Sequence, residues 1–130
     1  MKIKMNGNVL IINRIGKDDK LGLRINKDFF VYNFDKKSNN SSLVFEISNF
    51  LKLHKVTIDE HLSVLINQGP GSFSGVRVSI AVAKGLKISK KVKLYGYKNQ
   101  DLKVFNQENV EKLLSKNLIE KKLIKPIYLS

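Results

Sequence analysis

Short apolar runs and alternating segments along the first third of the chain predict strands. Val9–Ile12 is a run of four apolar residues, too short for a helix and suited to a buried strand. Lys20–Ile25 alternates between apolar and polar positions, and a tight turn at Asn26 to Asp28 leads into the aromatic and β-branched run Phe29–Phe34. The pattern therefore predicts three consecutive strands, of which the second and third form a hairpin.

Helices and strands alternate after this point. A helix over Ser42–His54 is predicted because apolar residues recur at the spacing of one buried helix face, at Leu43, Ile47, Phe50 and Leu51. The remaining predicted elements are a strand over Leu62–Asn67, a helix over Ser74–Ile88, a strand over Val92–Gly96 and a last helix over Glu108–Glu120. The order β-β-β-α-β-α-β, followed by a C-terminal helix, is typical of α/β folds of the ribonuclease-H-like class, which also form each half of the actin-like (ASKHA) fold.

Composition excludes several kinds of protein. The 130 residues suit one domain, 42% of them are hydrophobic, and no apolar run approaches the length of a membrane span. The N-terminus lacks the apolar segment of a signal peptide. Without cysteine there is no disulfide, thiolate nucleophile or cysteine-based zinc site, and two histidines, His54 and His61, are too few for a histidine-rich metal centre. We expect a small cytoplasmic domain with no membrane contact.

A formal charge of +13 suggests nucleic-acid binding. However, only three of the 24 basic residues are arginine, the side chain best suited to bidentate phosphate recognition, and the joint enrichment in lysine, asparagine and isoleucine is what an AT-rich coding sequence gives. A basic, non-catalytic ribonuclease-H-like module that binds nucleic acid therefore stays open as an alternative. Its contacts would include a lysine cluster, with two aromatic residues close by for base stacking, at Lys87, Lys90, Lys91, Lys93, Tyr95 and Tyr97.

One glycine-rich segment carries sharper chemistry. It follows a predicted buried strand and comprises Gly69, Pro70, Gly71, Ser72, Phe73, Ser74 and Gly75, with Arg77 in the first turn of the next helix. Ser72 or Ser74 can cap that helix, whose N-terminus favours an anion, so the loop is a candidate contact for an anion or a nucleotide. The spacing matches neither common phosphate-binding fingerprint, and Phe73 stands where a nucleophile elbow needs serine.

The helix after this loop has apolar residues on two neighbouring faces. Val76, Ile80 and Ala83 share one face, and a second face carries Val78, Val82 and Leu86. Two interpretations stay open: ordinary packing in a two-layer core, or a helix shared between its own sheet and the helices of a partner.

The segment from Gly69 to Arg77, continued by Ala83-Lys84-Gly85-Leu86, resembles the GPGSFTG-[LV]-R…AKGL signature of the TsaB (YeaZ) family, with Ser74 in place of threonine. The final Pro126-Ile127-Tyr128-Leu129 is similar to the family's C-terminal Pro-x-Tyr-Leu. The resemblance implies an actin-type N-terminal lobe over 1–98. It also implies that 99–130, a helix and a tail, replaces the family's second lobe, which would make this a one-lobed form.

The same resemblance implies a function. TsaB proteins are non-catalytic partners in the formation of N6-threonylcarbamoyladenosine at position 37 of tRNAs that read ANN codons. We therefore expect a TsaD-like subunit as heterodimer partner, a TsaE-like ATPase, tRNA bound through the complex, and a possible homodimer when the chain is alone. ATP and metal would be held by partner subunits and no cofactor by this chain. The family's helix pairing places the interface on Leu43, Ile47, Phe50, Leu51, Val76, Ile80, Ala83 and Lys84.

Catalysis by this chain alone is not expected. Family members end their first strand in Asp-Thr, but the equivalent positions here are Asn13 and Arg14, which removes a carboxylate that related enzymes use to hold a metal. No carboxylate occurs in Leu62–Asn67, and the two histidines do not form an H-x-x-x-H pair. We accordingly expect no catalytic and no metal-binding residues. Three acidic residues are expected in solvated turns, namely Asp18, Asp19 and Asp28.

Overall fold

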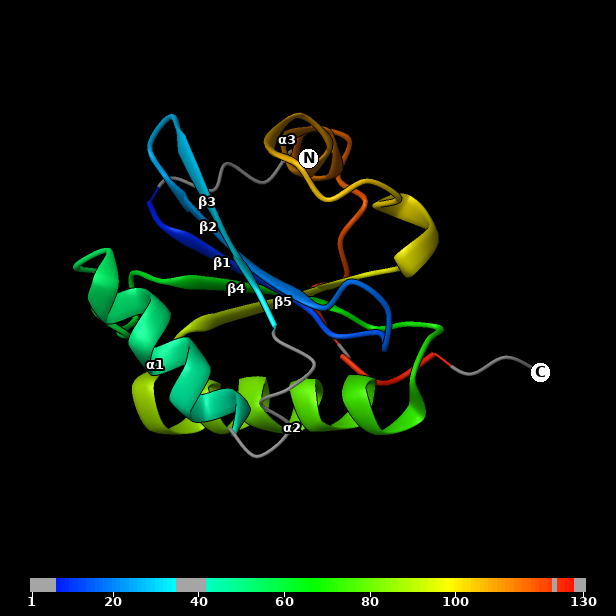
Figure 1. Cartoon of the computed structure of the whole chain (residues 1–130), viewed down its shortest axis with the longest axis horizontal. Helices are drawn as coiled ribbons and strands as arrows, with labels where there is room; N and C mark the ends of the chain where they lie inside the picture. The colour runs from blue at the N-terminus through cyan, green and yellow to red at the C-terminus, as the bar shows by residue number, and fades with distance from the viewer. Residues whose placement is uncertain (1–6, 35–41, 123, 128–130) are drawn as a thin grey trace.

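The fold is one five-stranded sheet with helices on both faces (Figure 1). The computed structural model describes residues 7–34, 42–122 and 124–127. The strands are β1 (Val9–Asn13), β2 (Lys20–Ile25), β3 (Asp28–Asn33), β4 (Ser63–Asn67) and β5 (Lys93–Tyr97). The helices are α1 (Leu43–Leu53), α2 (Phe73–Lys90) and α3 (Gln107–Ser115), and a short 3-10 turn covers Asn99–Asp101. The predicted order of elements is confirmed.

The sheet has the strand order β3-β2-β1-β4-β5. β1, β4 and β5 run parallel, and β2 runs antiparallel to both of its neighbours, β1 and β3. Parallel neighbours require a crossover, and α1 and α2 provide the crossovers on one face of the sheet, whereas α3 covers the other face (Figure 1). The carboxyl ends of the three parallel strands therefore meet at one edge, where ligands bind in many open α/β sheets.

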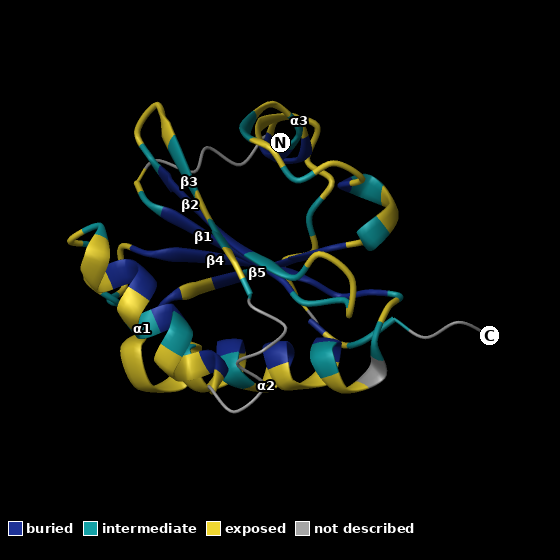
Figure 2. Ribbon diagram, in the orientation of Figure 1, coloured by how far each residue is buried: buried dark blue, intermediate teal, exposed yellow. Residues whose placement is uncertain are grey.

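The middle strands are buried on both faces, which explains their uninterrupted apolar runs (Figure 2). Along β1, Leu10 and Ile12 face α1 and α2, while Val9 and Ile11 face α3. The larger of the two core clusters lies between the sheet and the α1–α2 pair. The turn at Asn26, whose φ is 55°, joins the β2–β3 hairpin as predicted.

Each of the two crossover helices begins directly after a serine that caps its N-terminus. The side-chain oxygen of Ser42 accepts a hydrogen bond from the backbone N–H of Phe45, and Ser72 does the same for Gly75. The second helix is longer than predicted at its C-terminal end and stops at Lys91, which adopts the left-handed conformation at φ 61°.

The last helix is shorter than the periodicity predicts. It ends at Ser115 instead of Glu120, because Lys116 caps it and Asn117 turns the backbone to φ 58°. Leu118, which the pattern places on the buried side, consequently lies beyond the helix and is 42% exposed. The apolar face of α3 is otherwise as expected, with Val110, Leu113 and Leu114 buried.

Residues after β5 contact the sheet at one face, through α3, and at its β5 edge (Figure 1). The buried guanidinium of Arg24 on β2 donates to Glu111 of α3 at 2.8 Å, which fixes this helix on the sheet. Glu120 exchanges two backbone hydrogen bonds with Gly96 and so covers the outer edge of β5. Among the residues described, none of the helices combines the length and the apolar character needed to cross a bilayer.

Candidate functional site

The glycine-rich loop leaves the carboxyl end of β4 and packs against the loop between β1 and β2. A methyl group added at Gly71 would lie 2.7 Å from the Cβ of Ile15, and one added at Gly75 would lie 2.9 Å from the carbonyl oxygen of Arg14. The backbone N–H of Ser72 donates to the carbonyl of Ile15 at 2.6 Å. These glycines therefore allow two backbone segments to approach each other closely, a role that needs no ligand.

Some backbone N–H groups in the loop and at the start of α2 already donate hydrogen bonds to side chains of this protein. Ser72 caps the helix, Gly69 at φ +93° donates to the side chain of Asn67, and Pro70 lies between them after a cis bond. Ser74 and Arg77 are exposed at this end, and the side chain of Phe73 lies outside the described residues. A contact with an anion or a nucleotide at this loop stays a prediction.

The packing of Gly71 gives a testable difference between two glycines. Gly71→Ala is expected to lower the free energy of unfolding by about 1–3 kcal/mol, because the added methyl overlaps the backbone and Cβ of Ile15. Gly85→Ala, in the middle of α2 with no atom within 4 Å of the added methyl, is expected to raise it by about 0.5–1 kcal/mol. Urea unfolding of both variants measures the difference, and equal effects would contradict the packing role of Gly71.

A buried polar network lies at the carboxyl ends of β1, β4 and β5. Asn67 donates from Nδ2 to Oδ1 of Asn13 at 2.7 Å and to Oδ1 of Asn99 at 3.1 Å, and the hydroxyl of Tyr97 donates to Oδ1 of Asn13 at 2.9 Å. Burial raises the pKa of Tyr97 above its ordinary value, so the phenol keeps its proton and acts as a donor. The sequence marks Asn13 as the position of a missing carboxylate, but it carries no signal for the hydrogen-bond partners Asn67 and Tyr97.

This network ties the strand ends together with neutral groups. Both donors meet the same oxygen of Asn13, so that side chain is held in place by β4 and β5. Within the described residues, no three His, Asp or Glu side chains gather as metal ligands would.

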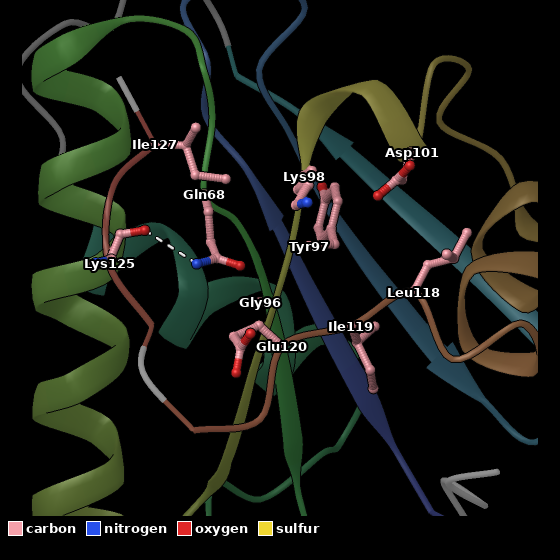
Figure 3. A pocket seen from close by; sticks show the side chains of 10 residues that line it. All are labelled: Gln68, Gly96, Tyr97, Lys98, Asp101, Leu118, Ile119, Glu120, Lys125 and Ile127. Atoms are coloured by element: carbon pink, nitrogen blue, oxygen red, sulfur yellow. Dashed lines mark hydrogen bonds between the residues drawn. The ribbon is translucent and has the colours of Figure 1, made fainter. Parts of the chain in front are cut away.

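A hollow of about 260 Å³ lies beside this network, between the end of β4, β5 and the last described residues (Figure 3). Its wall includes the apolar side chains of Leu118, Ile119 and Ile127. Gln68 donates from its amide nitrogen to the carbonyl of Lys125 at 3.1 Å, and its own backbone carbonyl accepts from Ile127. These hydrogen bonds hold the segment 124–127 against the carboxyl edge of the sheet. The side chains of Tyr128 and Leu129 in the family-like tail lie outside the described residues.

The residues predicted for a partner interface are mostly core residues, and this part of the prediction needs correction. Seven of the eight are between 0% and 5% exposed, packed between the helices and the sheet: Leu43, Ile47, Phe50, Leu51, Val76, Ile80 and Ala83. Lys84 alone of this set is exposed. The helical spacing correctly identified buried faces, but these faces are covered by the chain's own sheet, so they cannot reach a partner in the folded protein.

The outer sides of α1 and α2 carry exposed residues (Figure 2), and some of these residues are apolar. On α1, Val44 is 53%, Phe45 57% and Leu53 75% exposed, and on α2, Val78 is 47% and Ile88 82% exposed. We call these five residues the outer apolar set. The sequence of α1 could have indicated this exposure for Phe45, because on a helical projection Phe45 lies opposite the buried residues Leu43 and Ile47.

Of the side chains expected to contact nucleic acid in the alternative function, the lysines are exposed but Tyr97 is not. Lys87, Lys90, Lys91 and Lys93 are exposed around the end of α2. Tyr97, however, is 1% exposed with its hydroxyl bonded to Asn13, so it cannot stack on a base, and that prediction is wrong.

Asp19 and His54 each contact a neighbouring residue in the structure. Asp19, expected in a solvated turn, instead accepts from the N–H of Gly16 at 2.8 Å and lies 3.6 Å from the guanidinium of Arg14. Asp18 and Asp28 are exposed, as predicted. His54 stacks on Phe30 with ring centres 4.1 Å apart, at the end of α1.

Sequence comparison assigns the family. A model of the family described as "TsaD: tRNA N6-adenosine threonylcarbamoyltransferase" matches residues 36–113, which include both crossover helices and the glycine-rich loop. The chain belongs to this family. The matched region contains α1, β4, the glycine-rich loop, α2 and β5, and it does not include β1.

Curated relatives narrow the placement to the TsaB (YeaZ) members. Two proteins named tRNA threonylcarbamoyladenosine biosynthesis protein TsaB, from two Buchnera aphidicola strains, are 37% identical over 60 residues (strain Bp) and 33% identical over 61 residues (strain Sg). These matches cover 44% and 47% of this chain but only 27% and 29% of the relatives. The resemblance read from the glycine-rich motif is confirmed.

Solved structures confirm the actin-like, ribonuclease-H-like fold. YeaZ from Pseudomonas aeruginosa superposes with a TM-score of 0.60 at 17% identity, over 72% of this chain and 43% of its own. A second structure, titled as an uncharacterized protein with similarity to peptidase YEAZ from Pseudomonas aeruginosa, gives 0.62 at 17% identity, over 72% and 44%. The chain thus spans less than half of these proteins, and the division into 1–98 and 99–130 stays a prediction.

Proposed function

We propose that this chain is a non-catalytic, TsaB-like subunit that pairs with a TsaD-like subunit. The pair would form N6-threonylcarbamoyladenosine at position 37 of ANN-decoding tRNAs. A TsaE-like ATPase would join the pair, and the partners would supply ATP and metal. Membership of the family and the names of the curated relatives support this role.

The observation that carries the pairing is the outer apolar set. These five large apolar side chains are exposed on two adjacent helices, and burying them against a partner would remove apolar area from water. The interface proposed here therefore uses Phe45 and Val78, and not the core residues of the sequence-based prediction. Lys84 stays in the proposal because it is exposed on the same helix.

The non-catalytic role is supported by the chemistry at the strand ends. Asn13 occupies the end of β1, and its oxygen already accepts hydrogen bonds from Asn67 and Tyr97. An amide held in this way is a poor metal ligand compared with a free carboxylate. The cytoplasmic location expected for a tRNA-modifying assembly is part of the same proposal.

Co-purification with the TsaD protein of the same genome tests the pairing at about 0.3 M salt, which screens lysine-driven attraction. The unmodified chain is expected to form a one-to-one complex. Phe45→Glu and Val78→Glu are each expected to weaken the complex about tenfold or more, because each buries a charge in an apolar contact. Val104→Glu is the matched control, since Val104 is 59% exposed in the segment leading to α3 on the opposite face of the sheet.

Circular dichroism of the three variants verifies that the fold survives, as expected for exposed positions. Loss of binding in the Val104 variant but not in the other two would contradict the proposed surface. If the chain binds no TsaD but binds RNA with strong salt dependence and no sequence preference, the nucleic-acid alternative replaces this proposal.

A further inference from the structure

Within residues 7–34, 42–122 and 124–127, no strand pairs with the outer edge of β3, in contrast to the β5 edge. β3 ends the strand order, and no strand lies beyond it among the residues that the structure describes. On the opposite edge, Glu120 pairs with Gly96 and covers β5. An open strand edge presents a row of backbone donors and acceptors that another strand can pair with.

The register of the hairpin identifies which backbone groups point outward. The N–H of Phe34 donates to the carbonyl of Asp19 at 3.1 Å, one step beyond the Lys20–Asn33 pair. In an antiparallel ladder the direction of the backbone groups alternates, so the even-numbered residues of β3 bond to β2. The N–H and C=O groups of Phe29, Val31 and Asn33 consequently point away from the sheet.

This pattern is self-complementary about a two-fold axis at Val31. If two copies pair antiparallel with Val31 opposite Val31, then Phe29 of each copy faces Asn33 of the other, and all three outward residues exchange backbone bonds. The even-numbered positions then place Phe30 opposite Tyr32, an aromatic cross-strand pair of the kind that stabilises sheets. No residue of β3 is a proline or glycine.

The charge distribution also favours a second copy at this edge. The chain carries 24 basic residues, yet β3 contains none, and its only charged residue is Asp28 at the turn. In a pairing of two copies with a formal charge of +13 each, such a strand brings no basic side chain of its own against another. Val31 is 42% exposed there, and natural edges are usually protected by a lysine or a proline at such a position.

We propose that two copies of this chain associate through β3 and form one continuous ten-stranded sheet. This surface is separate from the outer apolar set, so the association is compatible with a partner bound to α1 and α2. The dimer closes at two copies, because each copy has one open edge and the pairing consumes it. A strand of six residues is about 20 Å long, so the contact is small and the dimer weak.

Sedimentation equilibrium over a concentration series of the full chain tests this proposal. The unmodified chain is expected to show a monomer–dimer equilibrium that strengthens with salt, since salt screens the repulsion between the two basic molecules. Val31→Lys and Val31→Glu are each expected to lower the association constant about tenfold or more, because each places two like charges opposite each other on the axis. Mixing the two variants in equal amounts is expected to restore dimers, since opposite charges then meet.

Val44→Lys is the matched control, because it also replaces an exposed valine by lysine but lies on α1. Its association constant is expected to equal that of the unmodified chain. A chain that stays monomeric at several hundred micromolar would overturn the proposal, as would a dimer lost in the Val44 variant and kept in the Val31 variants. Failure of the mixture to restore dimers, or growth into larger species, would exclude the two-fold register at Val31.

Discussion

Ile80→Glu is expected to unfold the chain at neutral pH and room temperature. Ile80 lies on the inner face of α2 and is 4% exposed within the core that α1, α2 and the sheet enclose. A carboxylate there is removed from water among the apolar side chains of the core cluster, which costs about 4 kcal/mol or more. Domains of this size have about 5–15 kcal/mol of stability, so at the lower end of that range the loss consumes most of it.

The pH dependence follows from the same burial. Burial raises the pKa of the introduced carboxyl group above its value in the unfolded chain, so the penalty is small at low pH and grows as the pH rises. Circular dichroism and urea unfolding near pH 4 and pH 7 measure this difference.

Lys84→Glu provides the control on the same helix. Lys84 is exposed one turn further along α2, so the substitution is expected to change the free energy of unfolding by no more than about 0.5 kcal/mol. If Ile80→Glu folded as stably as Lys84→Glu, the orientation of α2 against the sheet would be wrong. A glutamate at the core position Ile80 therefore cannot test partner binding, because the substitution disrupts the fold together with any surface that α2 presents.

Asn67→Ala is expected to lower the free energy of unfolding by about 3 kcal/mol, the second large effect. Asn67 is 1% exposed, donates to Asn13 and Asn99, and accepts from the N–H of Gly69. Truncation leaves the N–H of Gly69 and the oxygen of Asn99 without this partner, and a buried polar group that lacks a partner retains its full desolvation cost. Thermal and urea unfolding measure the loss.

Tyr97→Phe is the milder comparison within the same network. It removes one donor to Asn13, whose oxygen still accepts from Asn67, so a loss of about 1 kcal/mol is expected. The ring remains to fill the core between the sheet and α3. Equal losses in the two variants would contradict the central position of Asn67 in the network.

The candidate site shows how far sequence patterns extend. The glycine-rich segment identifies a sharp turn between a buried strand and a helix, because glycine spacing and a serine cap are local signals. The partners of that turn are residues such as Ile15 and Arg14, more than fifty positions earlier in the chain, and no local signal indicates them. The glycines are therefore read from the sequence as a possible ligand loop, and from the structure as a close contact between two loops.

The helices illustrate the same limit for surfaces. Periodicity shows that Ile47 and Ile80 lie on apolar faces, but it cannot show whether the sheet or a partner covers each face. The structure answers this question for the described residues: the sheet covers both, and Phe45 and Val78 are among the apolar side chains that remain in water.

By itself, the sequence determined the order of strands and helices, the hairpin, the presence of a serine cap at the start of α1 and α2, and the family signature. These features depend on periods of two or about four residues and on short motifs, so neighbouring residues specify them. Only the tertiary structure decided which apolar face is free, how Asn13, Asn67 and Tyr97 meet, and that β3 has an open edge. Those properties depend on contacts between residues far apart in the chain, which exist only once the sheet has brought them together.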